Sequence, residues 1–112
     1  MEELKIVKAE HSDLDELCKV INDIVLELFP HYFGLNDRKI SIHSTEERMK
    51  KEIVEGYIYK VMMKDNDEII GVVTIIDGEI ENMYLFPFYQ KRGYGRKVLS
   101  LVELDKEQYI TQ

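Results

Sequence analysis

Apolar residues recur at spacings of three and four from Leu14 to Leu28, after a short stretch of mostly apolar residues at Leu4 to Ala9. The short stretch predicts a strand, and the helical spacing predicts a long helix with one buried face that ends at Pro30. Ser12, with Asp15 three residues later, is the predicted cap of this helix. The apolar positions of the buried face are Leu14, Leu17, Cys18, Ile21, Ile24, Val25 and Leu28.

Residues 30–43 keep no regular spacing and contain Pro30, Gly34 and two histidines, which predicts a loop that is long for a chain of this size. A capping box at Ser44-Thr45-Glu46-Glu47 predicts a second, shorter helix that ends near Gly56. Loops of this length tend to be functional or mobile.

From Tyr57 the pattern becomes that of strands, with segments at Tyr57 to Lys64, Glu68 to Ile76 and Glu79 to about Phe86. The second segment is a nearly continuous β-branched run, which predicts a central strand buried on both faces. Asp77-Gly78 predicts a two-residue hairpin, so the three strands form an antiparallel meander. A loop and a helix over Arg96 to about Lys106 follow, and the last five residues have a strand-like composition.

The composition fits one folded domain spanning residues 1–112, because 45% of the residues are hydrophobic and 33% are charged. The 15 Lys and Arg are outnumbered by 22 Asp and Glu, which gives a net charge of −7. This balance argues against broad binding to nucleic acids or to anionic membranes. A bound anion must therefore be held by a local patch.

Cys18 is the only cysteine, so the chain forms no intrachain disulfide and no metal site built from several cysteines. A reducing compartment is favoured, and we expect a cytoplasmic protein with no signal peptide and no membrane span. Cys18 is interpreted as a small buried hydrophobe rather than a reactive thiol. No metal is predicted, because the histidines, cysteine and carboxylates form no close cluster in the sequence.

The segment from Gln90 to Lys97 enters a helix through Gly93 and Gly95 and carries the basic residues Lys91, Arg92, Arg96 and Lys97. A helix start offers unpaired N–H groups and a partial positive charge, and glycines let the backbone curl around an anion. A plain turn with solvated basic side chains is the alternative. Val98 occupies the place of the third glycine of a dinucleotide-binding motif, and the Gly-Lys-Ser/Thr ending of a triphosphate loop is absent.

The same residues resemble the GNAT superfamily of acetyl-CoA-dependent N-acetyltransferases. Gln90-x-x-Gly93-x-Gly95 is similar to that family's Gln/Arg-x-x-Gly-x-Gly/Ala signature, and Ile80 to Tyr89 resembles its fourth strand, with Pro87 and Tyr89 where a proline and an aromatic usually lie. Val98-Leu99 is similar to the apolar pair of the following helix. The resemblance covers nearly the whole chain and implies a mixed α/β fold, with a mostly antiparallel sheet flanked by helices.

The resemblance also implies the positions that bind acetyl-CoA. Backbone amides of the loop hold the pyrophosphate, the fourth strand pairs with the pantetheine arm, and the N–H of Leu85 polarises the thioester carbonyl as an oxyanion donor. The implied coenzyme-binding residues are Met83, Tyr84, Leu85, Gln90, Lys91, Arg92, Gly93, Tyr94, Gly95 and Arg96.

The catalytic base implied by the resemblance is a carboxylate or a water that takes a proton from the acceptor amine. Glu81 and Glu79 are the candidates, since alternation along the strand is expected to place them on one face with Met83 and Leu85. The alternative for each is a solvated carboxylate near a hairpin. His31 and His43 lie in or beside the loop that borders the acceptor pocket in this family, or they are exposed bystanders; His11 carries no functional signal.

The chain departs from the family pattern at its C-terminal end. A complete member continues with a fifth strand, a fourth helix that often carries the acid for the departing thiolate, and a final pair of strands, so this chain is expected to be shortened. Tyr109 lies too early to match that acid, and residues 109–111 are at most the start of a fifth strand.

The leading hypothesis is an N-acetyltransferase in which an unidentified amine, small molecule or peptide, attacks acetyl-CoA directly. The alternatives are a non-enzymatic module of the same fold, which binds an acyl-CoA or another protein, and a remnant without ligand. The open edge of Glu79 to Phe86 further predicts a homodimer or a completing partner chain that contacts this strand, the last helix and the tail. A monomer whose tail covers the edge is the alternative.

Overall fold

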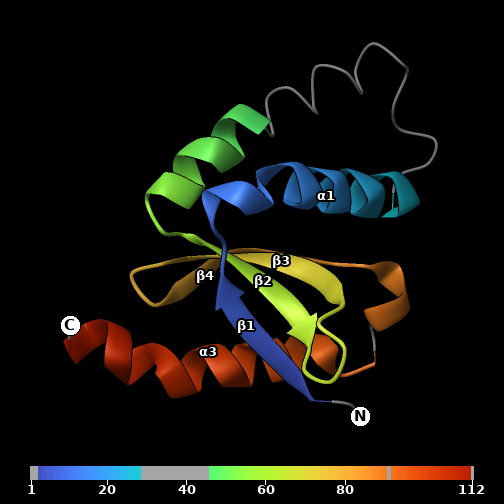
Figure 1. Cartoon of the computed structure of the whole chain (residues 1–112). Helices are drawn as coiled ribbons and strands as arrows, with labels where there is room; N and C mark the ends of the chain where they lie inside the picture. Colours follow the sequence, from blue (N-terminus) through green and yellow to red (C-terminus); the bar gives the residue numbers. More distant parts are fainter. Residues whose placement is uncertain (1–2, 29–45, 91, 112) are drawn as a thin grey trace.

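The computed structural model describes residues 3–28, 46–90 and 92–111 (Figure 1). A short 3-10 turn at His11–Asp13 precedes the first helix, and another at Pro87–Tyr89 follows the last strand. The regular elements are β1 (Leu4–Lys8), α1 (Leu14–Leu28), a helix over residues 46–54, β2 (Ile58–Met63), β3 (Ile69–Ile76), β4 (Glu79–Leu85) and α3 (Tyr94–Thr111).

The four strands form one antiparallel sheet in the order β1-β2-β3-β4. The prediction of a central, doubly buried strand is confirmed in β3, whose six inner residues are all buried. The predicted hairpin is also confirmed, because Asp77 and Gly78 have positive φ angles of 53° and 78°. Two residues with positive φ match the twist of a two-residue turn between antiparallel strands. The mixed α/β fold expected from the sequence is therefore the fold observed.

Helices cover both faces of the sheet (Figure 1). On one face, α1 and the helix over residues 46–54 pack on Val72 of β3, and on the other face α3 packs on Ile70, Val73 and Ile75. The buried residues on the α1 side are Ala9, Leu17, Ile21, Met49, Ile53, Ile58 and Val72. Those on the α3 side are Leu4, Tyr59, Val61, Met63, Ile70, Val73, Ile75, Leu85, Val98 and Val102.

The start of α1 differs from the expectation that Ser12 is its cap. Ser12 lies inside the 3-10 turn, so its backbone is already helical, and Glu10 has the extended backbone of a cap residue. The Asp13 carboxylate accepts a hydrogen bond from the N–H of Glu10 at 2.8 Å. Asp13 therefore closes this helix start, and the cap residue lies two positions before Ser12.

The last helix is longer at both ends than the spacing predicts. It begins at Tyr94 rather than Arg96 and continues to Thr111, so the prediction of strand-like structure at residues 109–111 is wrong. A strand needs a neighbour to satisfy its backbone groups, whereas a continuing helix satisfies them within itself. The predicted loop over residues 30–43, the cap residue Ser44, and the histidines at 31 and 43 lie outside the described residues.

Candidate functional site

The outer edge of β4 has no neighbouring strand among the described residues, since β4 is hydrogen-bonded to β3 alone. The N–H of Phe86 donates to the carbonyl of Ile70 on β3 at 3.1 Å. Backbone groups of successive strand residues point in opposite directions, so the N–H groups of Leu85 and Met83 point toward the open edge. Tyr84, between them, directs its backbone groups toward β3. Leu85 and Met83 are thus the residues that offer hydrogen bonds to an incoming extended ligand.

Gly71 on β3 lies opposite Leu85 and allows the two strands to approach closely. A Cβ atom added at Gly71 would clash with the carbonyl oxygen of Tyr84 and lie 2.6 Å from the Cδ2 of Leu85. Leu85 itself is 5% exposed and packs in the core on the α3 side. Because Gly71 has no side chain, β3 can pack closely against the backbone of Leu85, whose N–H is the candidate oxyanion donor.

A bulge interrupts β4 at Glu81. Asn82 is opposite Thr74, whereas Ile80 is opposite Ile75, which leaves Glu81 as an extra residue without a partner in the ladder. The bulge reverses the alternation, because Glu79 is opposite Ile76 on the α1 side while Met83 and Leu85 belong to the α3 side. The expectation that Glu79 shares a face with Met83 and Leu85 is therefore wrong, whereas the pairing assigns no face to Glu81; both residues are exposed.

The chain leaves β4 through the 3-10 turn at Pro87–Tyr89, which brings Gln90 back beside the strand. The side-chain amide of Gln90 donates to the carbonyl of Leu85 at 2.8 Å. The ring of Tyr89 packs edge-on against the ring of Tyr94, with 5.2 Å between the centroids. These contacts hold the loop and the first residue of α3 against the end of β4.

The start of α3 leaves room for a ligand. Gly93 has a φ of 86°, a backbone conformation that favours glycine, and its carbonyl accepts the N–H of Lys97 at 3.1 Å. The N–H groups of Tyr94, Gly95 and Arg96 belong to the first turn and have no partner within the helix. Among the described residues, a Cβ atom added at Gly95 would meet no heavy atom within 4 Å apart from those of its chain neighbours and its own helix backbone. The first turn of α3 is consequently open in front of its glycine.

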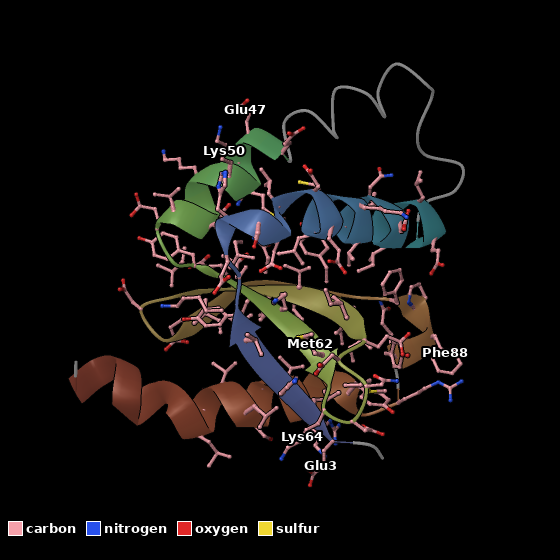
Figure 2. All side chains as sticks on the ribbon, in the orientation of Figure 1. Glu3, Glu47, Lys50, Met62, Lys64 and Phe88 are labelled. Atoms are coloured by element: carbon pink, nitrogen blue, oxygen red, sulfur yellow. The ribbon has the colours of Figure 1, made fainter. Side chains whose placement is uncertain are left out.

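The charges around this helix start are positive. Its first turn contains no acidic residue, and it is followed by Arg96 and Lys97. No ion pair between described residues involves either side chain. The guanidinium of Arg92 lies over the ring of Phe88, 4.3 Å from its centroid, and Phe88 projects from the periphery of the molecule (Figure 2). Lys91 lies outside the described residues.

Other polar groups of the described part offer little chemistry. Burial raises the pKa of the Cys18 thiol, and the charges of Glu46 and Asp15 raise this pKa further, so Cys18 is a poor nucleophile. No three His, Cys, Asp or Glu side chains gather at a possible metal site within the described ranges. None of the described helices combines the length and the apolar character needed to cross a bilayer.

The structure brings together some, but not all, of the residues that the sequence predicts at the site. Leu85, Gln90 and the first turn of α3 lie next to one another, whereas Glu79 lies at the far end of β4 beside the hairpin. Sequence reasoning missed Gly71, Phe88 and the bulge at Glu81. A glycine inside the β-branched run of β3 was the available signal for Gly71, because such a glycine often marks a close backbone approach.

Comparison with known proteins concerns the family and the fold of the chain. Residues 21–108 match the model of the acetyltransferase (GNAT) family. The PaiA N-acetyltransferase from Thermoplasma acidophilum, solved in complex with coenzyme A, has a TM-score of 0.72 and 19% identity, over 95% of this chain and 73% of that one. A predicted acetyltransferase from Clostridium acetobutylicum, solved with acetyl-CoA, has a TM-score of 0.61 and 16% identity, over 95% and 75%.

The apo form of YjaB from Escherichia coli is a third similar structure, with a TM-score of 0.63 and 14% identity, over 89% of this chain and 64% of that one. At these identities the likeness concerns the fold. The sequence matches no curated protein.

Proposed function

The chain belongs to the acetyltransferase (GNAT) family, and we propose that it transfers the acetyl group of acetyl-CoA to an amine. The observation that carries this proposal is the combination of an open, basic helix start at α3 with the open edge of β4 beside it. The first binds a diphosphate through backbone N–H groups, and the second pairs with an extended amide-containing arm. Acetyl-CoA contains both chemical groups in one molecule.

In this proposal the diphosphate rests on the backbone from Arg92 to Arg96, where the N–H groups of the first turn are unpaired. Gly95 leaves the space for the phosphate oxygens, and Arg96 adds positive charge at its side. The pantetheine arm then runs along β4, where Met83 and Leu85 direct their N–H groups outward.

The chemical step is an attack of the neutral amine on the thioester carbonyl. The carbonyl oxygen gains negative charge as the new C–N bond forms, and the N–H of Leu85 stabilises that charge. Collapse of the intermediate breaks the C–S bond and releases the coenzyme A thiolate, which takes up a proton. Loss of one such donor costs on the order of a hundredfold in rate.

Glu81 is the better of the two candidate bases. It lies four residues from Leu85, which is about 13 Å along an extended strand, whereas Glu79 lies about 20 Å away. Neither carboxylate reaches the amine directly over these distances, so Glu81 acts through one or more waters. The bulge supports this role, because Glu81 has no partner residue on β3 and its side chain need not follow the regular alternation of faces along the strand.

Titration calorimetry with acetyl-CoA tests the binding part of the proposal. Heat and a saturable isotherm are expected, and no heat at millimolar acetyl-CoA would overturn both the enzymatic proposal and the acyl-CoA sensor. Release of free coenzyme A in the presence of polyamines, amino acids and peptides tests the transfer. Binding without amine-dependent thiol release would favour the sensor.

A homodimer, or a complex with another chain, and a cytoplasmic location belong to the same proposal. The assembly is supported by the open edge of β4 and by two exposed leucines on α3, Leu99 at 48% and Leu104 at 75%. A chain bound at the edge of β4 would compete with acetyl-CoA for the same backbone groups. Sedimentation with and without acetyl-CoA is the test, and a monomer under both conditions would contradict the dimer.

A further inference from the structure

Three aromatic rings form a connected series beside the start of α3. The ring of Tyr94, the first residue of α3, packs edge-on against Tyr89, with 5.2 Å between the centroids. Tyr89 packs edge-on against Phe88 at 5.0 Å, and the guanidinium of Arg92 lies over the ring of Phe88, 4.3 Å from its centroid. Arg92 is therefore a cation at the outer end of this series, and Tyr94 lies at the helix end.

The contact between Arg92 and Phe88 orients an exposed cation. Phe88 is 64% exposed and projects from the periphery of the molecule beyond the end of β4, away from the hairpin at Asp77-Gly78 (Figure 2). Its ring restricts an arginine side chain that would otherwise sample many rotamers. None of the ion pairs between described residues includes Arg92. The N–H donors of the oriented guanidinium are thus left for an oxyanion.

Acetyl-CoA has a phosphate group for which the backbone of the helix start makes no provision. Two of its three phosphates form the diphosphate, which in the proposed function rests on the N–H groups of the first turn of α3, and the third is a monoester on the 3′ oxygen of the ribose. The pantetheine arm leaves the diphosphate along β4, so the nucleoside leaves it in another direction.

The position of Arg92 fits this third phosphate. Arg92 precedes Tyr94 by two residues, so its Cα lies within about 7 Å of the first helical Cα, a separation that one ribose can span. Its guanidinium contacts Phe88 at the periphery rather than the edge of β4. A planar cation with several N–H donors is well suited to a phosphate monoester.

We propose that Arg92, oriented by the ring of Phe88, binds the 3′-phosphate of coenzyme A and makes the site selective for coenzyme A over 3′-dephospho-coenzyme A. The inference rests on the proposed function, and it concerns the nucleoside end of the ligand rather than the thioester. Arg92 contacts the ligand, whereas Phe88 is a positioning residue that acts through Arg92. Arg96 lies within the first turn and serves the diphosphate, which makes it the matched control.

Titration calorimetry with coenzyme A and with 3′-dephospho-coenzyme A measures this selectivity. Physiological salt is used so that long-range attraction is screened. The parent protein should bind coenzyme A at least about tenfold more tightly, the value of one charge-assisted contact. Arg92→Gln should weaken coenzyme A alone and reduce the preference to less than about threefold. Arg96→Gln should weaken both ligands by the same factor and keep the preference.

Variants of Phe88 test its positioning role. Phe88→Leu keeps an apolar side chain but removes the ring, so the preference for coenzyme A should fall by about threefold while the Kd for 3′-dephospho-coenzyme A stays the same. Phe88→Tyr keeps a ring and should restore the preference of the parent protein. A purely structural role would lower the melting temperature and weaken both ligands alike.

Phosphorus-31 NMR locates the effect on the ligand itself. The monoester and the diphosphate of coenzyme A give separate resonances, and both should shift when the parent protein binds. At saturating Arg92→Gln, the shift of the monoester should be largely lost, and the shift of the diphosphate should remain.

Two outcomes would overturn the proposal. One is equal affinity of the parent protein for the two ligands, and the other is an Arg92→Gln variant that weakens both ligands alike, as expected if Arg92 served the diphosphate. Arg92 and Phe88 are both exposed, so their variants should keep the melting temperature of the parent protein. Absence of binding of either ligand to the parent protein would instead contradict the proposed function itself.

Discussion

The two long helices begin in opposite ways. At the start of α1, the carboxylate of Asp13 accepts the N–H of Glu10 and lies 3.2 Å from the ammonium of Lys60, and Asp15 and Glu16 occupy the first turn. At the start of α3, the first turn contains no acidic residue, and glycines and basic side chains surround it. The chain itself supplies carboxylates at the first helix start, whereas the first turn of the second contains none, and there we propose that acetyl-CoA binds.

This difference separates a structural helix start from a binding one. A helix start favours negative charge by about 0.3–1 kcal/mol, and α1 obtains this stabilisation from its own carboxylates. In α3 the sequence places cations at the end where the helix dipole disfavours them. The stability forgone there is consistent with selection for a ligand that supplies the missing negative charge.

The largest effect is expected when the open space at α3 is filled. Gly95→Val places a branched side chain where the structure has no neighbouring atom, so the fold should be kept while the phosphates are displaced. Loss of two charge-assisted hydrogen bonds corresponds to a weakening of at least about a hundredfold. Calorimetry with acetyl-CoA gives the Kd, and Ser100→Val, on an exposed turn of the same helix, is the matched control. Equal affinity in both variants would show that the diphosphate lies elsewhere.

A smaller effect is expected from reversing the charge at the same place. Arg96→Glu should weaken acetyl-CoA binding by about tenfold, the value of one lost charge contact, while the melting temperature stays the same or rises. The parent's affinity should fall with added salt, and the variant's affinity should fall less steeply. Weaker binding of acetyl-CoA together with an unchanged or higher melting temperature is the result that supports the proposed site. A variant that loses both would indicate a structural role for Arg96.

The corresponding change at α1 should affect stability and leave acetyl-CoA binding unchanged. Asp15→Lys places a cation at a helix start that is otherwise acidic, and a loss of about 0.3–1 kcal/mol in the free energy of unfolding is expected. Denaturant unfolding measures this loss, and calorimetry should show an unchanged Kd for acetyl-CoA. A changed Kd would mean that the two helix starts are not independent.

The binding role of the start of α3 stays a prediction, and it depends on local signals. Gly93, Gly95 and their basic neighbours stand together in the sequence, and a backbone amide site depends on local conformation, so such a site could be proposed before the fold was known. The closure of α1 by Asp13 could not be predicted in the same way, because Ser12 gives an equally good local signal; in the structure Asp13 also pairs with the distant Lys60.

The candidate base was predicted less well for a related reason. The two-residue alternation of β4 placed Glu79 and Glu81 with Leu85, but the bulge at Glu81 breaks this alternation. The position of a bulge depends on how β4 pairs with β3 across the hairpin, so the sequence of residues 79–85 alone does not predict it. Local patterns therefore predicted the helices and strands. The face of the sheet on which a given β4 side chain lies depended on the pairing with β3.

The smallest effect concerns the acidic surroundings of α1. The pKa of Cys18 is raised by burial and by the charges of Glu46 and Asp15, so its alkylation by iodoacetamide at pH 8 should be slower than that of an unstructured cysteine peptide. The rate should increase as the pH rises toward the elevated pKa, because the thiolate is the reacting form. Asp15→Lys should accelerate the reaction modestly. A rate equal to that of the peptide would contradict the elevated pKa.

Gly71 has a consequence for how variation in this chain would be interpreted. It lies on the central strand, and no ligand is expected to touch it, yet any larger residue there would push against the backbone of Tyr84 and Leu85. A saturation mutagenesis screen scored by activity should therefore mark Gly71 as intolerant, alongside the glycines of the helix start. Intolerance at Gly71 would identify a residue that supports the proposed site through the backbone of β4. A search limited to residues that contact the ligand would miss it.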